Sequence, residues 1–127
     1  MNTTPPAIDY KACMDACQAC VIACNTCAAA CLKESDVQMM AACIAQDLEC
    51  AQICELAVAA MARQSPHAPD ICRLCAQICQ ACADECSKHS HDHCQTCAAA
   101  CQQCAMSCNL MAVSYTHLRA HETPEHL

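Results

Sequence analysis

Nineteen cysteines dominate this 127-residue sequence, and most of them recur at alternating steps of three and four residues. Three segments carry unbroken runs of this pattern, at residues 13–31, 72–86 and 94–108. Steps that average 3.5 residues keep side chains on one stripe of an α-helix, and such a stripe forms the core seam of a left-handed bundle. The pattern therefore predicts columns of thiols that face the interior of a helical bundle.

A fourth segment follows the same steps but mixes other side chains into the stripe. Its cysteines are Cys43, Cys50 and Cys54, and the position between the first two holds Asp47. Asp47 is either a boundary residue or a buried carboxylate that needs a cation or a hydrogen-bond donor to offset its desolvation. We keep it among the candidate metal ligands, with Met40, which lies one step before Cys43 on the same stripe.

Thiols at this spacing favour metal binding over disulfide bonds. Cβ atoms at these helical steps are about 5–6 Å apart, which exceeds the roughly 3.8 Å that a disulfide prefers. Zinc sites are closed tetrahedra with a defined set of four ligands, whereas Cu(I) is soft, is content with two or three thiolates and can share them along a ladder. The pattern predicts many Cu(I) ions per chain, with zinc buffering as the alternative.

The candidate metal ligands comprise all of the thiols, the carboxylate on the second stripe and a few residues near one end of the predicted bundle. They are Cys13, Cys17, Cys20, Cys24, Cys27, Cys31, Cys43, Cys50, Cys54, Cys72, Cys75, Cys79, Cys82, Cys86, Cys94, Cys97, Cys101, Cys104, Cys108, Asp47, Met40, His89, His91 and His93. Imidazole and thioether bind Cu(I) less firmly than thiolate does. We expect the methionine and the three histidines to guide copper into the column; the alternative is a polar connection that merely joins two helices.

Catalysis is not expected from these cysteines. A thiol redox enzyme needs one activated cysteine pair in an asymmetric setting with a lowered pKa. Nineteen near-equivalent cysteines single out no such pair. The sequence therefore predicts a metal store without catalytic residues.

The elements that must position these thiols are all helical. The sequence has no glycine, and helix-forming residues such as Ala, Gln, Met and Leu dominate what is not cysteine. Helices are expected at about residues 5–33, 36–63, 69–88 and 90–112. Pro5 and Pro6 fit the first turn of the first helix, and short connections make neighbours antiparallel. The predicted fold is an all-α, antiparallel up-down-up-down four-helix bundle over residues 7–112, with cysteines lining the core.

Residues 113–127 contain no cysteine and are predicted to form an irregular tail, either a frayed extension or a read-through segment foreign to the domain.

No secretory signal is expected at the start, and the longest apolar stretches are too short to span a bilayer. Clustered thiols stay reduced in the cytosol. The net charge of −7 argues against nucleic acid and suits a cation. We expect a cytoplasmic chain that binds neither nucleic acid nor membrane.

These motifs resemble the bacterial copper storage proteins, specifically their cytosolic branch. The resemblance covers about residues 8–112 and rests on the cysteine ladders, on the segment LECAQIC at 48–54 and on HSHDHC at 89–94. It implies a bundle that fills its core with Cu(I), a homotetramer of such bundles, and a role in holding copper for later use. It identifies neither a copper donor nor an acceptor. Residues 113–127 depart from the family pattern, in which chains end soon after the last cysteine helix.

Overall fold

The computed structural model describes residues 6–122, and side chains as far as residue 112. Within that part the chain forms four α-helices and one short 3-10 helix, and no strand. The elements are α1 (Lys11–Cys31), η1 (Val37–Met40), α2 (Ala41–Ala62), α3 (Ala68–Cys86) and α4 (Asp92–Glu122). The predicted all-α class is confirmed.

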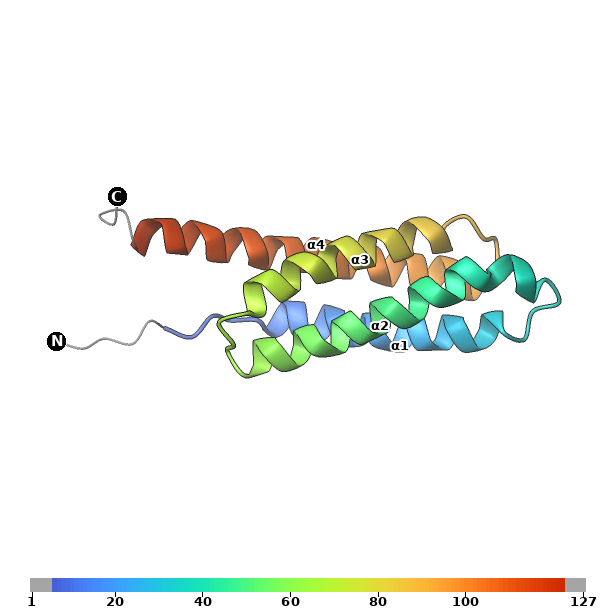
Figure 1. Cartoon of the computed structure of the whole chain (residues 1–127), viewed down its shortest axis with the longest axis horizontal. Coiled ribbons are helices and arrows are strands. Elements are labelled where there is room, and N and C mark those ends of the chain that lie inside the picture. The colour runs from blue at the N-terminus through green and yellow to red at the C-terminus, as the bar shows by residue number, and fades with distance from the viewer. Residues whose placement is uncertain (1–5, 123–127) are drawn as a thin grey trace.

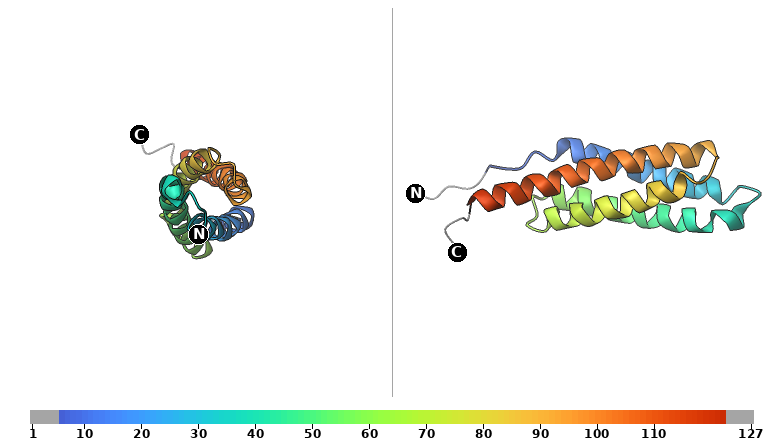
Figure 2. Two further views of the ribbon diagram at one scale, coloured as in Figure 1. Left: turned by 90° about the vertical axis from the view of Figure 1, so that its right-hand side faces the viewer. Right: turned by 90° about the horizontal axis from the view of Figure 1, so that it is seen from above.

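The helices run alternately up and down around one central column (Figures 1 and 2). Helix α1 packs on α2 and α4, and α3 packs on the same two helices. We call the end formed by the connections 32–36 and 87–91 the histidine end. The opposite end, formed by the connection 63–67 and the segment 6–10, is the proline end. The predicted up-down-up-down topology is confirmed.

The core consists largely of sulfur and alanine. All nineteen cysteines are buried, and even the most exposed, Cys13, shows only 2% of its surface. The largest fully buried side chains are Met40, Met61 and Asp47, since the chain has no Phe or Trp to fill the column. Small side chains make fewer dispersion contacts than Leu or Phe would. The metal-free bundle therefore lacks the packing that usually stabilises a core.

Gln64 ties the proline end together. Its backbone lies in the left-handed region at φ 54°, where a Cβ costs roughly 1–2 kcal/mol. The position lets Ser65 N–H donate to the Ala60 carbonyl at 2.9 Å, which caps α2. The Gln64 side chain also accepts from Ile8 N–H at 3.1 Å and donates to the Ile8 carbonyl at 2.9 Å. These hydrogen bonds fasten the segment before α1 to the end of α2.

The first helix begins later than the sequence indicated. Helix α1 starts at Lys11 rather than in the first turn after Thr4, and residues 6–10 are not helical. Gln64 occupies both polar groups of the Ile8 backbone, so these groups are not available to a helix. The Asp9 carboxylate accepts from Lys11 N–H at 3.0 Å where the helix begins. Pro5 lies outside the described residues.

The last helix is longer than expected, and the prediction of an irregular segment directly after residue 112 is wrong. Helix α4 continues to Glu122. The sequence offers no reason to stop earlier, because the first proline after Cys108 is Pro124 and helices usually end at or before the residue that precedes a proline. Whether residues 113–127 are foreign to the domain stays a prediction.

Among the described helices, α1 is long and apolar enough to cross a membrane by length and composition alone, with a mean hydropathy of 1.3. Core helices pass the same test, so it is weak evidence for a membrane span. In the fold, the cysteine stripe of α1 packs against the other helices of the bundle.

Candidate metal centre

Thiols from different helices meet along the whole column. The Sγ atoms of Cys43 and Cys86 lie 3.3 Å apart, and those of Cys50 and Cys79 lie 3.4 Å apart. Neighbours along one helix are also close, at 3.8 Å for Cys20 and its i+4 partner on α1. The column is therefore a continuous network of sulfur rather than a set of separate pairs.

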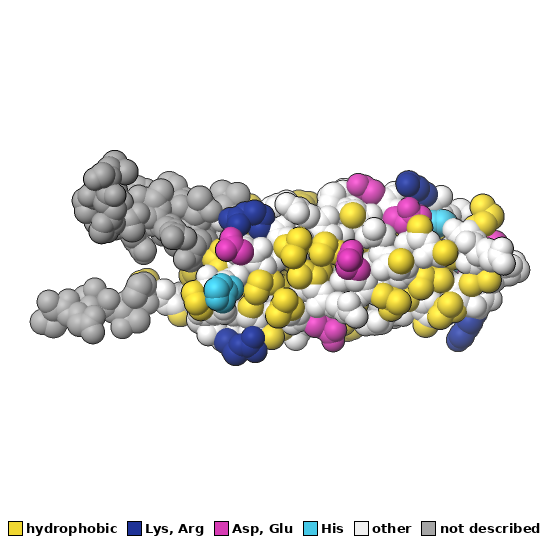
Figure 3. Space-filling view, viewed as in Figure 1, with side chains coloured by type: hydrophobic (Ala, Val, Ile, Leu, Met, Phe, Trp, Pro, Cys, Tyr) yellow, Lys and Arg dark blue, Asp and Glu magenta, His cyan; other side chains and the backbone are white. Residues whose placement is uncertain are grey.

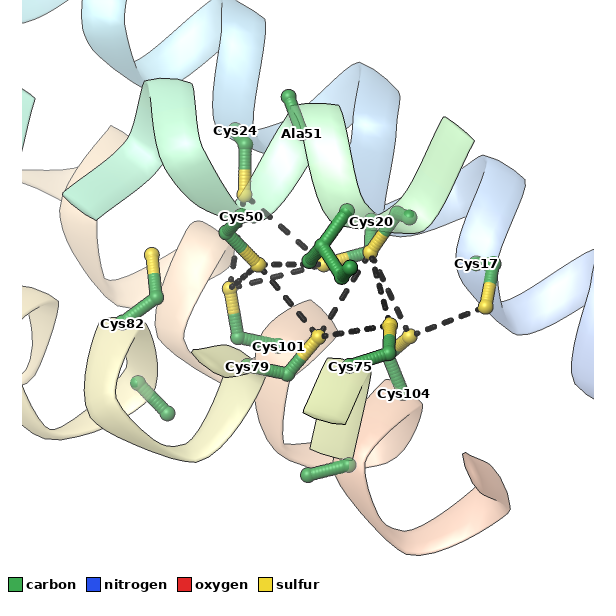
Figure 4. Packing of buried hydrophobic residues seen from close by; sticks show 14 of the residues in the cluster. Cys17, Cys20, Cys24, Cys50, Ala51, Cys75, Cys79, Cys82, Cys101 and Cys104 are labelled. Carbon is green, nitrogen blue, oxygen red and sulfur yellow. Dashed lines mark hydrogen bonds between the residues drawn. The ribbon is translucent and has the colours of Figure 1, made fainter. Parts of the chain in front are cut away.

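Groups of four thiols, each group drawn from three helices, are tight enough to hold a metal ion. Within each group the Sγ atoms all lie within 4.8 Å of one another. Such groups include Cys17/Cys75/Cys104/Cys108, Cys20/Cys24/Cys50/Cys101, Cys20/Cys50/Cys54/Cys79, Cys24/Cys82/Cys97/Cys101 and Cys27/Cys31/Cys43/Cys94. Several cysteines belong to two groups, and their sulfur atoms point toward one another in Figure 4. Shared membership suits a soft ion whose thiolate ligands bridge two metals.

Burial keeps two thiols near the histidine end, Cys94 and Cys43, protonated in the metal-free chain. It raises the pKa of the Cys94 thiol to about 11 and also raises the pKa of Cys43, because a thiolate in this apolar surrounding loses its hydration. A metal ion binds thiolate rather than thiol, so each binding step releases protons.

Asp47 is the one buried carboxylate among the described residues, and it lies inside the thiol column. Its Oδ1 accepts hydrogen bonds from the thiols of Cys86 at 3.2 Å, Cys82 at 3.3 Å and Cys97 at 3.3 Å. These donors offset part of its desolvation. Of the two interpretations left open by the sequence, a boundary residue is wrong, since none of its surface is exposed.

The buried carboxyl of Asp47 gives metal-free stability a pH dependence. Burial, with a smaller contribution from charge at Cys97, raises the Asp47 pKa from 3.8 to about 9. The folded chain therefore holds a proton that the unfolded chain releases above about pH 4. The contribution of Asp47 to the free energy of unfolding is fully present below about pH 4. It decreases as the pH rises toward 9, by at most about 1.4 kcal/mol per pH unit.

Asp47→Asn keeps an acceptor oxygen for the thiols and should remove this slope. The measurement is urea unfolding of both metal-free chains under a phosphine reductant at several pH values. For each chain the free energy of unfolding is plotted against pH. Equal slopes of these two plots would contradict the assignment.

His93 joins the column at the histidine end. Its Nδ1 lies 3.4 Å from Cys27 Sγ and 3.6 Å from Cys94 Sγ. On the other side of the ring, Nε2 lies 2.8 Å from Glu34 Oε2. Only 18% of the His93 side chain is exposed. Of the three predicted histidines, His93 is the one whose ring nitrogen is within hydrogen-bond distance of the thiols.

The other predicted guide residues sit differently. His91 stacks on the His93 ring with centroids 5.3 Å apart, and its Nε2 lies 3.4 Å from Asp36 Oδ1. His89 pairs with Glu85 at 3.0 Å, away from the stacked rings. Met40, the last residue of η1, is fully buried in the core cluster at the same end. Of the four predicted guide residues, the structure thus stacks His91 on His93. It leaves His89 in a separate pair with Glu85.

Sequence reasoning missed the two acidic partners at this end, Glu34 and Asp36. Both follow α1 in the connection 32–36, and both lie within 3.5 Å of a histidine ring nitrogen. The available signal was the ESD segment at 34–36 in the loop that an antiparallel bundle must place beside the histidines. Acidic loop residues are normally solvated, so composition alone does not distinguish these from surface charges.

The comparisons with known proteins agree with this geometry. The model of the copper storage protein family matches residues 7–113. The Cu(I)-bound copper storage protein BsCsp3 is 53% identical, with a TM-score of 0.79 over 82% of this chain and 99% of that one. A cytosolic copper storage protein from Streptomyces lividans, seen with five coppers, is 34% identical, with a TM-score of 0.80 over 82% of this chain and 92% of that one.

A curated relative, the uncharacterized cysteine-rich protein YhjQ of Bacillus subtilis (strain 168), is 54% identical over 78 residues, which are 61% of this chain and 72% of that protein. The family match spans nearly all of the described bundle, from the residues before α1 to the first part of α4. This chain belongs to the copper storage protein family.

Proposed function

We propose that this protein stores many Cu(I) ions in the cytoplasm, bound by the thiolates of its core. The observation that carries the proposal is the overlap of the four-thiol groups. Cys20, Cys24, Cys50 and Cys101 each belong to two of them, so the column forms one extended ligand. The copper found in the two solved relatives, one of them described as cytosolic, supports the same cargo and the same compartment.

The geometry favours storage over two other functions. Zinc prefers closed tetrahedral sites with four ligands of its own, whereas these groups share their cysteines. A thiol enzyme needs an accessible, activated cysteine, whereas every thiol here is buried. We therefore assign the nineteen thiols as ligands and propose that the chain performs no catalysis.

Capacity tests the proposal directly. If each Cu(I) takes two thiolates and each thiolate bridges two ions, the numbers of ions and cysteines are equal, which gives roughly 15–20 Cu(I) per chain. The measurement is an anaerobic titration against a chromophoric Cu(I) competitor, with a parallel zinc titration as the control. Saturation at four or fewer copper ions, or an equal capacity for zinc, would rule the assignment out.

We also propose that copper passes into the column at the histidine end. There His93 lies beside the first thiols, and His91 stacks on the His93 ring. Met40 is buried just before α2, and the His93 ring is partly exposed. Asp47 lies deeper in the column, where it accepts hydrogen bonds from the thiols of Cys82, Cys86 and Cys97. We propose that its oxygens join a cluster of copper ions there. Copper donors and acceptors are not assigned.

The outer surface fits a homotetramer of such bundles, which we propose for this chain. Hydrophobic side chains lie along the length of the bundle between scattered charges (Figure 3). Ile22 on α1 and Leu110 on α4 expose 68% and 64% of their surfaces, respectively. Sedimentation equilibrium should give about 54 kDa, four times the chain mass of 13.6 kDa. Replacing Ile22 with Lys should lower that mass, and a single-chain mass for the unmodified protein would exclude the tetramer.

A further inference from the structure

His93 lies between two chemically different partners. Its Nδ1 faces the thiols of Cys27 and Cys94, at 3.4 and 3.6 Å. Its Nε2 faces the carboxylate of Glu34, at 2.8 Å. The connection before η1 and the start of α4 supply the carboxylate and the ring, which are 59 residues apart in sequence. The two nitrogens of one ring thus connect the thiol column to a carboxylate at the surface.

The carboxylate decides which ring nitrogen carries the proton. A neutral imidazole has one N–H and one lone pair, and a carboxylate can only accept a hydrogen bond. The contact at Nε2 therefore places the N–H there and leaves the lone pair on Nδ1. A soft metal ion binds that lone pair, and binding at Nδ1 then removes no proton from the ring. Metal-binding histidines are commonly oriented in this way by a carboxylate on their far nitrogen.

Glu34 is distinguished from the neighbouring acidic residues by what it contacts. Its Oε2 also lies 3.5 Å from Nδ1 of His91, the ring that stacks on His93. Asp36 meets the far side of the His91 ring, at 3.4 Å, and Glu85 meets His89 and Lys88. Glu34 is thus the carboxylate, among the described residues, that is shown in contact with the ring touching the thiols.

We propose that Glu34 is a positioning residue for copper uptake. It holds His93 as the Nε2–H tautomer, with the Nδ1 lone pair aimed at Cys27 and Cys94 and with Cys31 slightly farther away, at 3.9 Å. An arriving Cu(I) thus finds one imidazole nitrogen and three thiols together. The inference rests on the proposed function, because it assigns Glu34 a part in filling the same column. Glu34 itself does not bind copper in this arrangement.

Nitrogen-15 NMR of the metal-free chain tests the tautomer without any copper. The His93 ring signals are identified by their loss in His93→Ala. The unmodified chain should show the Nε2–H pattern, and Glu34→Ala should shift His93 toward a mixture of tautomers. Glu34→Gln should restore the pattern, because its amide oxygen accepts the same hydrogen bond. Asp36→Ala is the matched control and should leave His93 unchanged.

Stopped-flow transfer of Cu(I) from a chelator tests the consequence. Glu34→Ala should slow uptake by about tenfold, the lower end of the effect of such oriented partners, and leave the final capacity unchanged. The same substitution in a His93→Ala background should slow uptake no further, since the ring that it positions is gone.

An unchanged His93 tautomer in Glu34→Ala, or equal slowing with and without the His93 ring, would overturn the role of Glu34. Failure of every chain, including the unmodified one, to take up copper would instead overturn the proposed function. The NMR result would still decide whether Glu34 sets the tautomer, so the two failures are distinguishable.

Discussion

Filling the column with Cu(I) is expected to raise the midpoint of thermal unfolding by tens of degrees. The metal-free core has few large apolar side chains, and Met40 and Met61 are the largest of those that are fully buried. A ligand that binds only the folded state at a hundred times its dissociation constant adds about 2.7 kcal/mol per site. A handful of occupied sites therefore adds more than about 10 kcal/mol, a large shift for a single domain of this size.

Calorimetry of the metal-free and copper-filled chains under anaerobic, reducing conditions measures this difference. Extraction of the copper with a strong chelator should return the midpoint to its metal-free value, which controls for irreversible damage. Coincident midpoints for the two forms would show that copper does not sit in the core.

The second large effect concerns the rate of exchange. Replacing Met40 with Leu and the three histidines His89, His91 and His93 with Ala should slow copper uptake and release by about tenfold or more, as expected when weak ligands worth about 1.4 kcal/mol are lost from the rate-limiting step. Capacity should stay nearly intact, because most thiols lie deeper in the column. Leu is chosen for Met40 because this side chain is fully buried and a smaller one would leave a cavity.

The measurement is stopped-flow transfer of Cu(I) to and from a competing chelator. His67→Ala is the matched control, since His67 is exposed at the proline end and should not affect the rate. A variant that loses half of its capacity at an unchanged rate would make the four residues storage ligands and refute a role in passage.

The periodic part of the structure was predictable from the sequence, because the cysteine steps encode it directly. Alternating steps of three and four specify both the helices and the face that each one buries, and all nineteen cysteines are indeed buried. Asp47 follows the same rule, since its place on the stripe puts it inside the column. No contact between distant residues had to be known for these predictions.

The remainder depends on contacts that no local pattern encodes. The late start of α1 follows from the hydrogen bonds between Gln64 and Ile8, 56 residues apart. The pairing of Glu34 with His93 spans 59 residues. Antiparallel packing placed their two connections at one end of the bundle, but loop side chains have no periodicity from which a contact could be inferred.

The fastening of the proline end has a consequence for the order in which stored ions turn over. Tyr10 and Met61 are buried there, and Gln64 holds the preceding segment across the end of α2. If copper passes only at the histidine end, the ions that bind last are the first to be released. Ions beside Cys13 and Cys108 then form a long-lived reserve, while those beside Cys27 and Cys94 exchange with each change in supply. One chain would thus hold two pools of copper of different age.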